Sequence, residues 1–590
     1  MFGRTFGSKF LKTSHSSWRQ PLSIGLAALF CAVTASSLQA AERVGDFSLL
    51  DQDGFFHHIG WYDDHKAIAF LVQVNGSDQT EQAAATYAQL QSRFDTQGIE
   101  FMMINPLGQE RASVKQAAAD MGVSIPVLID DAQMISSAMG IDKSGEVFLF
   151  SPSTFEVMFR GPVTALEAAL NEVVADKPVS TAVVAMTGSD VTYQSNVSIS
   201  YVSDVAPILA DNCATCHRDG GIAPFAMDSH AMVQGWSPMI REVLMTKRMP
   251  PGQIDPHVGN FSNDYVLSVE EQQTLISWVE AGSPKDGSSD PLTALTWPES
   301  KWAFGEPDLI VKVPPQEIPA TGVMDYITVM VPFAGLDRDR WVRASQYIAG
   351  DRTVLHHTLN AVIAPGTRPT AGSFLGGGDP NAAFVTPYIP GAEPHMEAAN
   401  TGGLLKAGSM LGLQLHYTTT GKETVDASEI GVWFYPDDQV PQERRSGECA
   451  CIFPDGWTNI PAYDPNFEQS QTIVIEREAY LQSFIPHMHF RGKNMRFAAH
   501  YPDGSIEQLI NIANYNYNWQ LDYQLEEPKR VPAGTKIVVT AAFDNSAQNK
   551  ANPDPAREVP WGQQSWDEMF FGQVYWKYVD QSTLVSSTAQ

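Results

Sequence analysis

The histidines with the most informative spacing lie in the C-terminal half of the chain. The stretch 484-FIPHMHFRG-492 places His487 and His489 one residue apart inside an apolar segment. In a β-strand, side chains at i and i+2 point to the same face, so these two imidazoles could bind one metal ion together. The alternative is a strand whose solvent face happens to carry two histidines. A metal site needs further ligands, which the rest of the chain has to supply.

Four more candidate ligands occur in β-like sequence on either side of this pair. They are His356 and His357 in 354-VLHHTLNAVI-363, His416 in 411-LGLQLHYTTTG-421, and Met569 in 561-WGQQSWDEMFFG-572. Imidazoles suit copper in both oxidation states, whereas a thioether favours Cu(I). Neighbouring residues in a regular strand point to opposite faces, so the adjacent histidines need a bulge or turn to bind one ion. Taken singly, Met569 and His416 would each more commonly be core residues, and we expect His395 and His500 to be structural.

This ordered set resembles the ligands of the copper type II, ascorbate-dependent monooxygenases, the family of peptidylglycine α-hydroxylating monooxygenase and dopamine β-monooxygenase. The resemblance covers residues 298–590 and rests on six ligands in order. It implies that His356, His357 and His416 hold an electron-transfer copper. It also implies that His487, His489 and Met569 hold a second copper, which binds oxygen.

A different motif, 213-CATCH-217, predicts covalent attachment of a c-type haem. Cys213 and Cys216 would form thioethers to the haem, and His217 would be one axial ligand. The alternative is a CxxC redox pair with an incidental histidine. The surrounding sequence resembles a small class I-like cytochrome c, with Met249 in 248-RMPPG-252 as the expected second axial ligand and Met245 as its rival.

Residues 41–177 alternate apolar strand-like runs with helical stretches such as 81-EQAAATYAQLQSRF-94, a pattern typical of an α/β fold. The segment resembles a thioredoxin-like, peroxiredoxin-type domain. However, the loop that would carry the reactive cysteine reads 75-NGSDQT-80, and the usual Thr-Pro is Ser144-Gly145. Without a thiolate there is no thiol redox chemistry, so we expect a scaffold or docking module.

The fold class predicted for the whole chain is multidomain, ending in two all-β, jelly-roll-like sandwiches. Short apolar runs separated by proline and glycine dominate everything after residue 298. The expected divisions are a signal peptide at 1–40, a thioredoxin-like domain at 41–177, a linker at 178–198, a cytochrome c-like domain at 199–290, and β-sandwiches at 298–445 and 446–590.

The N-terminus indicates export. Basic residues precede an apolar run from about Leu22 to Val33, followed by 34-TASSLQA-40, which is typical of a cleaved secretory signal. We therefore expect a periplasmic or secreted protein without stable membrane insertion. The formal net charge of −29 argues against nucleic acid as a partner.

Cys449 and Cys451 are the only cysteines after the signal that lie outside the CxxCH motif. They could pair with each other, pair between chains, or bind metal, and we favour an accessory disulfide.

Together these features predict an exported monooxygenase with two copper ions and one haem c. It would hydroxylate a small organic or peptide-like substrate with O2. The haem domain would feed electrons one at a time, supplemented by a possible external one-electron donor. The alternative is a non-catalytic copper-binding or electron-transfer protein, and neither the substrate nor the donor follows from the sequence.

Overall fold

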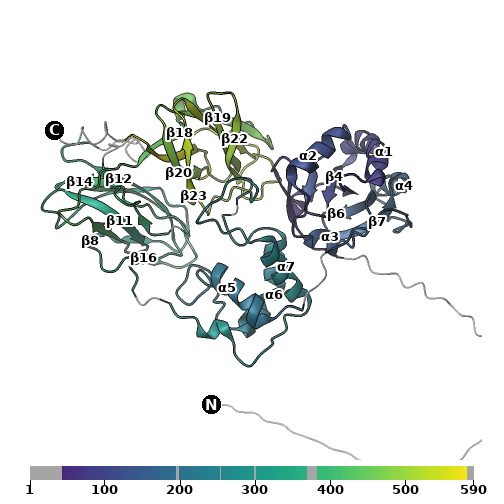
Figure 1. Cartoon of the computed structure of the whole chain (residues 1–590), viewed down its shortest axis with the longest axis horizontal. Coiled ribbons are helices and arrows are strands. Elements are labelled where there is room, and N and C mark those ends of the chain that lie inside the picture. Colours follow the sequence, from purple (N-terminus) through teal and green to yellow (C-terminus); the bar gives the residue numbers. More distant parts are fainter. Residues whose placement is uncertain are drawn as a thin grey trace, which may run out of the picture. The chain divides into compact units, whose positions relative to one another are not determined.

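The computed structural model describes residues 43–193, 198–252, 254–297, 300–368, 382–391 and 393–580 (Figure 1). The expected signal peptide lies outside these residues. None of the described helices combines the length and the apolar character that crossing a membrane requires.

The N-terminal part is built on one seven-stranded sheet with the strand order β2-β1-β5-β4-β3-β6-β7. Strands β3, β4 and β5 are parallel, and β6 and β7 pair antiparallel at one side. The strands are β1 Ser48–Asp51, β2 Phe56–His58, β3 Ala67–Val72, β4 Ile99–Asn105, β5 Val127–Ile129, β6 Glu146–Ser151 and β7 Glu156–Pro162. This topology is thioredoxin-like, as the sequence predicted.

The central strand β3 is buried on both faces because its residues are apolar at every position. Ala69 and Leu71 face a cluster with helices α1 and α4, while Ile68 and Phe70 face a second cluster on the other side. The helices of this part are α1 Asp78–Phe94, α2 Arg111–Asp120, α3 Met134–Ala138 and α4 Val163–Val174.

The expected linker runs along this domain over part of its length. Val183 forms a bridge with Arg160, and Asp190 forms one with Lys143. Residues 194–197 lie outside the described residues.

The CxxCH segment lies in a small helical region. Its elements are η3 Tyr201–Val205, α5 Ala206–Asn212, α6 His230–Met245 and α7 Val269–Glu280. Helix α7 begins with a capping box, in which Ser268 and Glu271 bond each other's backbone N–H groups. Trp278 of α7 stacks on Tyr201, and both rings belong to the buried cluster that also contains Phe70. The helices therefore share a core with one face of the N-terminal sheet.

The next 150 residues form the first β-rich domain, with one three-stranded sheet of order β10-β15-β12 and one five-stranded sheet around β11. Its strands are β8 Leu309–Lys312, β9 Gln316–Ile318, β10 Ile327–Pro332, β11 Arg340–Ile348, β12 Leu355–Ile363, β13 His395–Met396, β14 Gly403–Leu405, β15 Met410–Tyr417, β16 Thr424–Asp426 and β17 Glu429–Phe434. Leu413 and Leu415 of β15 and Val432 of β17 share one core cluster, so the two sheets pack face to face.

The last β-rich domain has two four-stranded antiparallel sheets, β18-β25-β20-β23 and β19-β24-β21-β22. Its strands are β18 Ser446–Ile452, β19 Phe467–Ile475, β20 Ala479–His487, β21 Gly492–His500, β22 Ile506–Ile512, β23 Tyr523–Val531, β24 Thr535–Phe543 and β25 Phe570–Tyr578. Phe484 of one sheet contacts Phe497 of the other at 5.3 Å between ring centroids. This arrangement is a β-sandwich.

The loop where a thioredoxin-like domain would carry its reactive thiol holds hydroxyl groups instead. Ser77 caps helix α1 and its Oγ lies 2.8 Å from the Oγ of Ser144. Next to Ser144, Gly145 has φ +73°, and a Cβ there would meet the backbone of Gln79 at 2.8 Å. The backbone at this point therefore excludes the proline that such domains usually carry.

We expect the haem-loaded full chain not to reduce protein disulfides with a thiol donor, because no thiolate exists at this loop. Ser77→Cys should introduce a reactive thiol, since a cysteine at a helix N-terminus has a lowered pKa. Alkylation rate and insulin reduction would be measured for both proteins, with Cys213→Ala/Cys216→Ala as a control for the other thiols. Disulfide reduction by wild type that persists in Cys213→Ala/Cys216→Ala would contradict the expectation.

Candidate metal centre

The first histidine set lies on two neighbouring strands of the three-stranded sheet. His357 of β12 is paired with His416 of β15, and the register shifts between Leu355 and His357. This irregularity is the bulge that two adjacent histidines need in order to share one site, as the sequence predicted. All three imidazoles of the set are buried, with at most 9% of His356 exposed.

The Nδ1 atoms of this set converge. The Nδ1 of His357 lies 2.9 Å from that of His356 and 3.4 Å from that of His416. His356 donates its other ring N–H, at Nε2, to the side-chain oxygen of Asn518 at 3.1 Å, which leaves its Nδ1 lone pair facing the other two rings. The ligand atoms of the three residues lie within 4.8 Å of one another, a spacing suited to one metal ion.

The second set presents the opposite ring nitrogens. His487 donates Nδ1–H to Oε1 of Gln520 at 2.5 Å, and His489 donates Nδ1–H to the carbonyl of Asp567 at 3.2 Å. The Nε2 of His489 is buried and has no hydrogen-bond partner. An orphaned buried nitrogen with its partner nitrogen fixed by a hydrogen bond is the usual state of a metal-ligating imidazole.

The strand geometry expected for this pair is only half right. His487 is the last residue of β20, and His489 lies beyond the strand. The ladder ends there because the N–H of His489 donates to Oε2 of Glu568 rather than to a neighbouring strand. The two rings nevertheless lie 5.2 Å apart between centroids.

Glu568 ties the end of β20 to the start of β25. Its carboxyl also accepts the backbone N–H groups of Arg491 and Met569, at 2.7 and 3.3 Å. The register of β20 and β25 ends with the pair His487 and Phe571. Met569 is buried, with 3% exposed, and its backbone N–H shares Oε2 of Glu568 with the N–H of His489.

The two sets meet in one cluster. The rings of His357 and His487 lie 6.0 Å apart, although they come from different β-domains. Tyr517 stacks on His356 at 4.4 Å and stands edge-on to His489 at 6.1 Å. The sequence predicted both sets but not their direct contact.

Burial keeps all five imidazoles neutral. Desolvation lowers the pKa of His487 to about 4 and that of His416 to about 3. It also lowers the pKa of His356, His357 and His489, the last two helped by the neighbouring imidazoles. In the unfolded chain these imidazoles become protonated below their usual pKa, whereas in the folded chain burial opposes their protonation. The metal-free fold therefore loses stability as the pH falls from about 6.5 toward 4.

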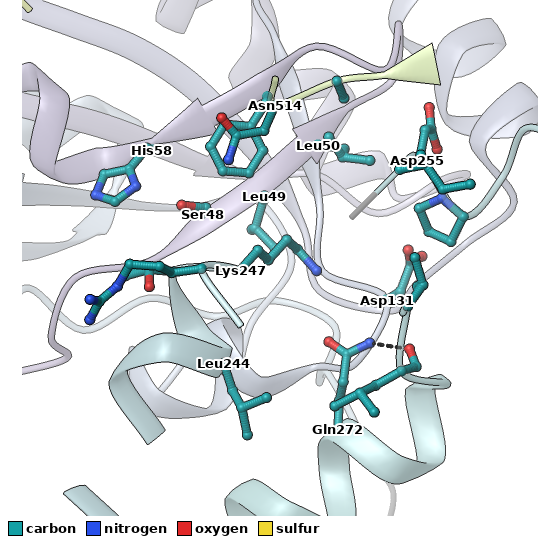
Figure 2. A pocket seen from close by; sticks show the side chains of 18 of the residues that line it. Ser48, Leu49, Leu50, His58, Asp131, Leu244, Lys247, Asp255, Gln272 and Asn514 are labelled. Carbon is teal, nitrogen blue, oxygen red and sulfur yellow. Dashed lines mark hydrogen bonds between the residues drawn. The ribbon is translucent and has the colours of Figure 1, made fainter. Parts of the chain in front are cut away.

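A cavity of about 1410 Å³ reaches the second set. His489, Tyr517 and Asn518 line one part of it, and residues of the helical and N-terminal parts line the rest. Figure 2 shows Lys247, Asp131 and Asp255 in its wall together with Leu49 and Leu244. The wall is thus partly apolar and partly charged, and it leaves room for a molecule beside His489.

The CxxCH segment is also arranged in a definite way. The Nδ1 of His217 donates to the carbonyl of Phe225 at 3.1 Å, which leaves Nε2 for a ligand. Cys213 and Cys216 are not joined to each other. Burial raises the pKa of the Cys213 thiol to about 12, which disfavours the alternative of a CxxC redox pair. Met249 is half-buried, while Met245 belongs to the hydrophobic core.

The remaining candidates lie as follows. Cys449 and Cys451 form a disulfide with each other within β18, the accessory disulfide that we favoured. His395 lies 3.3 Å from Glu397, and His500 ends strand β21 away from the histidine cluster.

Several residues of the site were missed at the level of sequence. Tyr517, Asn518 and Gln520 lie between β22 and β23, and Glu568 precedes Met569. The run 515-YNYNWQ-520, rich in amides and aromatic rings, was the signal available.

Known structures resemble part of this chain, about a quarter of its length. A hypothetical protein from Sinorhizobium meliloti is 19% identical, with TM-score 0.25, covering 26% of this chain and 95% of its own. A putative thiol:disulfide interchange protein DsbE from Chlorobium tepidum is 14% identical (TM-score 0.21; 23% and 96%). Peroxidoxin BcpB from Mycobacterium tuberculosis is 13% identical (TM-score 0.21; 23% and 96%). No protein-family model and no curated protein sequence matches the chain.

Because the five imidazoles stay neutral well below their usual pKa, we expect protons to compete weakly with copper for them. Copper content should change less than about twofold between about pH 7.5 and about pH 5.5. A solvated tri-histidine peptide, measured beside it, should lose most of its copper over the same range. Steep loss from the protein between about pH 7 and about pH 6 would contradict the burial argument.

Proposed function

We propose that this chain is an exported copper-dependent monooxygenase, which hydroxylates a small organic or peptide-like substrate with O2. The observation that carries the proposal is the meeting of five neutral imidazoles in two sets, one presenting Nδ1 atoms and the other Nε2 atoms. The donor types suit copper in both oxidation states, and Met569 would favour the reduced ion in the second set.

The residues present fit two copper ions. His356, His357 and His416 would hold one ion, and His487, His489 and Met569 the other. Bound copper would supply the one-electron redox chemistry that O2 activation needs. The protein would hold the imidazoles neutral, exclude bulk water by burial and admit substrate through the cavity beside His489.

Hydroxylation of a C–H bond consumes O2, two electrons and two protons, and yields an alcohol and water. A haem c held by Cys213, Cys216, His217 and Met249 would deliver the electrons one at a time, after reduction by an external donor. The position of the CxxCH segment supports this role. Burial raises the pKa of the Cys216 thiol, and Arg352, four residues before His356, is close enough to oppose that rise. Tyr265, also near Cys216, donates its hydroxyl to the carbonyl of Gly391 in the first β-domain at 3.2 Å.

A non-catalytic copper-binding or electron-transfer protein is the second candidate. The burial of all five histidines favours it, because tightly enclosed ions exchange electrons without needing substrate access. Oxygen uptake by copper-loaded, reduced protein with candidate substrates separates the two functions.

We expect Cys213→Ala or Cys216→Ala to abolish the covalent attachment that keeps haem on the denatured chain, because each variant lacks one of the two cysteines that form thioether bonds. The measurement is haem absorbance of the denatured chain after expression with a cytochrome c maturation system. Cys449→Ala should retain the full absorbance and serves as the matched control. A denatured wild-type chain without haem would overturn this part of the proposal.

We expect Met569→Ala to retain copper, more weakly, because two imidazoles remain, while product formation falls by orders of magnitude. His416→Ala should spare the second set and slow the delivery of the second electron. Copper content, haem spectrum and product yield would be compared with wild type. Full hydroxylation by Met569→Ala would show that Met569 is a core residue and that the six-ligand assignment is wrong.

A further inference from the structure

The segment 515–520, between β22 and β23 of the second sandwich, contacts both histidine sets. Asn518 bonds His356 of the first sandwich, and Gln520 bonds His487 of the second. We propose that this segment, here termed the amide strap, is a positioning element: it selects which ring nitrogen each of these two histidines turns toward a metal. The inference rests on the proposed copper-binding function.

The orientation of each strap amide is set by a second hydrogen bond. The Nδ2 of Asn518 donates to Oδ1 of Asn516 at 3.3 Å, and the Nε2 of Gln520 donates to the carbonyl of Tyr517 at 2.8 Å. With the NH2 groups so engaged, the amide oxygens must face the imidazoles. Each oxygen can only accept, so each bonded ring nitrogen has to carry the proton.

The two amides therefore impose opposite tautomers. Asn518 holds the proton of His356 on Nε2 and frees Nδ1, toward the Nδ1 atoms of His357 and His416. Gln520 holds the proton of His487 on Nδ1 and frees Nε2, as the Asp567 carbonyl does for His489. Acceptors of this kind orient metal-bound imidazoles and raise their basicity.

Tyr517 anchors the amide strap at the histidine cluster. Its ring stacks on His356 at an interplanar angle of 18°. Its hydroxyl lies 2.6 Å from Oγ of Ser565 and 3.2 Å from Nδ1 of His416. An ion held by the first set would take the lone pair of His416, and Ser565 would remain as the hydroxyl's partner. The strap thus stays anchored with or without metal.

The consequence is specific. One histidine of the first sandwich depends for its orientation on a side chain of the second, so copper affinity of the first set should respond to a substitution outside its own domain. A merely structural strap would not give a response that follows hydrogen-bond acceptance.

The test uses full-length protein and copper alone as the probe. Each set is read separately, in a His487→Ala background for the first set and a His416→Ala background for the second. Asn518→Leu should weaken copper binding by the first set about 10–100-fold, and Gln520→Leu should do the same for the second set. Asn518→Asp and Gln520→Glu, which keep an acceptor oxygen, should restore most of the affinity.

Copper titration is accompanied by the electron paramagnetic resonance spectrum of Cu(II), whose nitrogen couplings should change in the leucine variants and return in the acidic ones. Asn459→Leu, at an exposed amide of the same sandwich, is the matched control and should leave both readouts unchanged. If wild type binds copper and the leucine variants match it in affinity and spectrum, the strap proposal is wrong while the proposed function stands. If wild type binds no copper, both are wrong. If a leucine variant fails to fold, the acidic variants decide. Unaltered copper affinity in the acidic variants supports the proposal, and loss of copper affinity in them overturns it.

Discussion

The site depends on five buried imidazoles remaining uncharged. Charged imidazolium groups this close together would repel one another and would each carry a large desolvation cost. Neutral rings avoid both, but each then has one donor and one acceptor nitrogen that must be accommodated. The carbonyl of Asp567 and the amides of Asn518 and Gln520 accept from three of the five rings, those of His489, His356 and His487. What remains is a group of lone pairs that could hold a soft or borderline cation, which is the arrangement the proposed function uses.

Meeting that constraint uses residues from both β-domains. Four of the five histidines sit at strand positions fixed by the sheets, including the irregularity at His356 and the pairing of His357 with His416, and His489 lies just beyond β20. The acceptors sit on loops, where a side chain can be aimed without disturbing a ladder. Glu568 combines both functions. Where the strand hydrogen bonds of β20 end, its carboxyl group accepts the backbone N–H groups of His489 and Met569 and so holds these two residues together. The strands set the spacing of the histidines, and the loops carry the acceptors that orient the histidine rings.

The strands could be predicted from the sequence, but the side chains on the loops that complete the site could not. Apolar strand-like runs alternating with helical stretches predicted the α/β part, and short apolar runs separated by proline and glycine predicted the β-rich remainder, because burial imposes those patterns directly. The pair His487 and His489 followed from spacing, as did the need for a bulge or turn beside His356, whereas the division into two ligand sets followed from the family resemblance. Asn518, Gln520 and Glu568 could not be predicted. Their roles depend on which distant backbone or ring they meet, and a local pattern of amides is common in ordinary turns. The end of β20 before His489 was missed for the same reason.

One ion pair bears on why a thioredoxin-like domain without a thiol is still part of this chain. Asp255, fully buried, receives a bidentate pair of hydrogen bonds from Arg111 of the N-terminal domain and another from Asn511 of the last sandwich. The amide of Asn511 also donates to the carbonyl of Gly54. Removing one partner of such a buried pair costs on the order of 3–5 kcal/mol, because the other charge is left without compensation. Deleting the N-terminal domain would strand the Asp255 carboxylate in that way. The N-terminal domain is thus a structural dependency of its neighbours, although its loop at Ser77 carries no thiol.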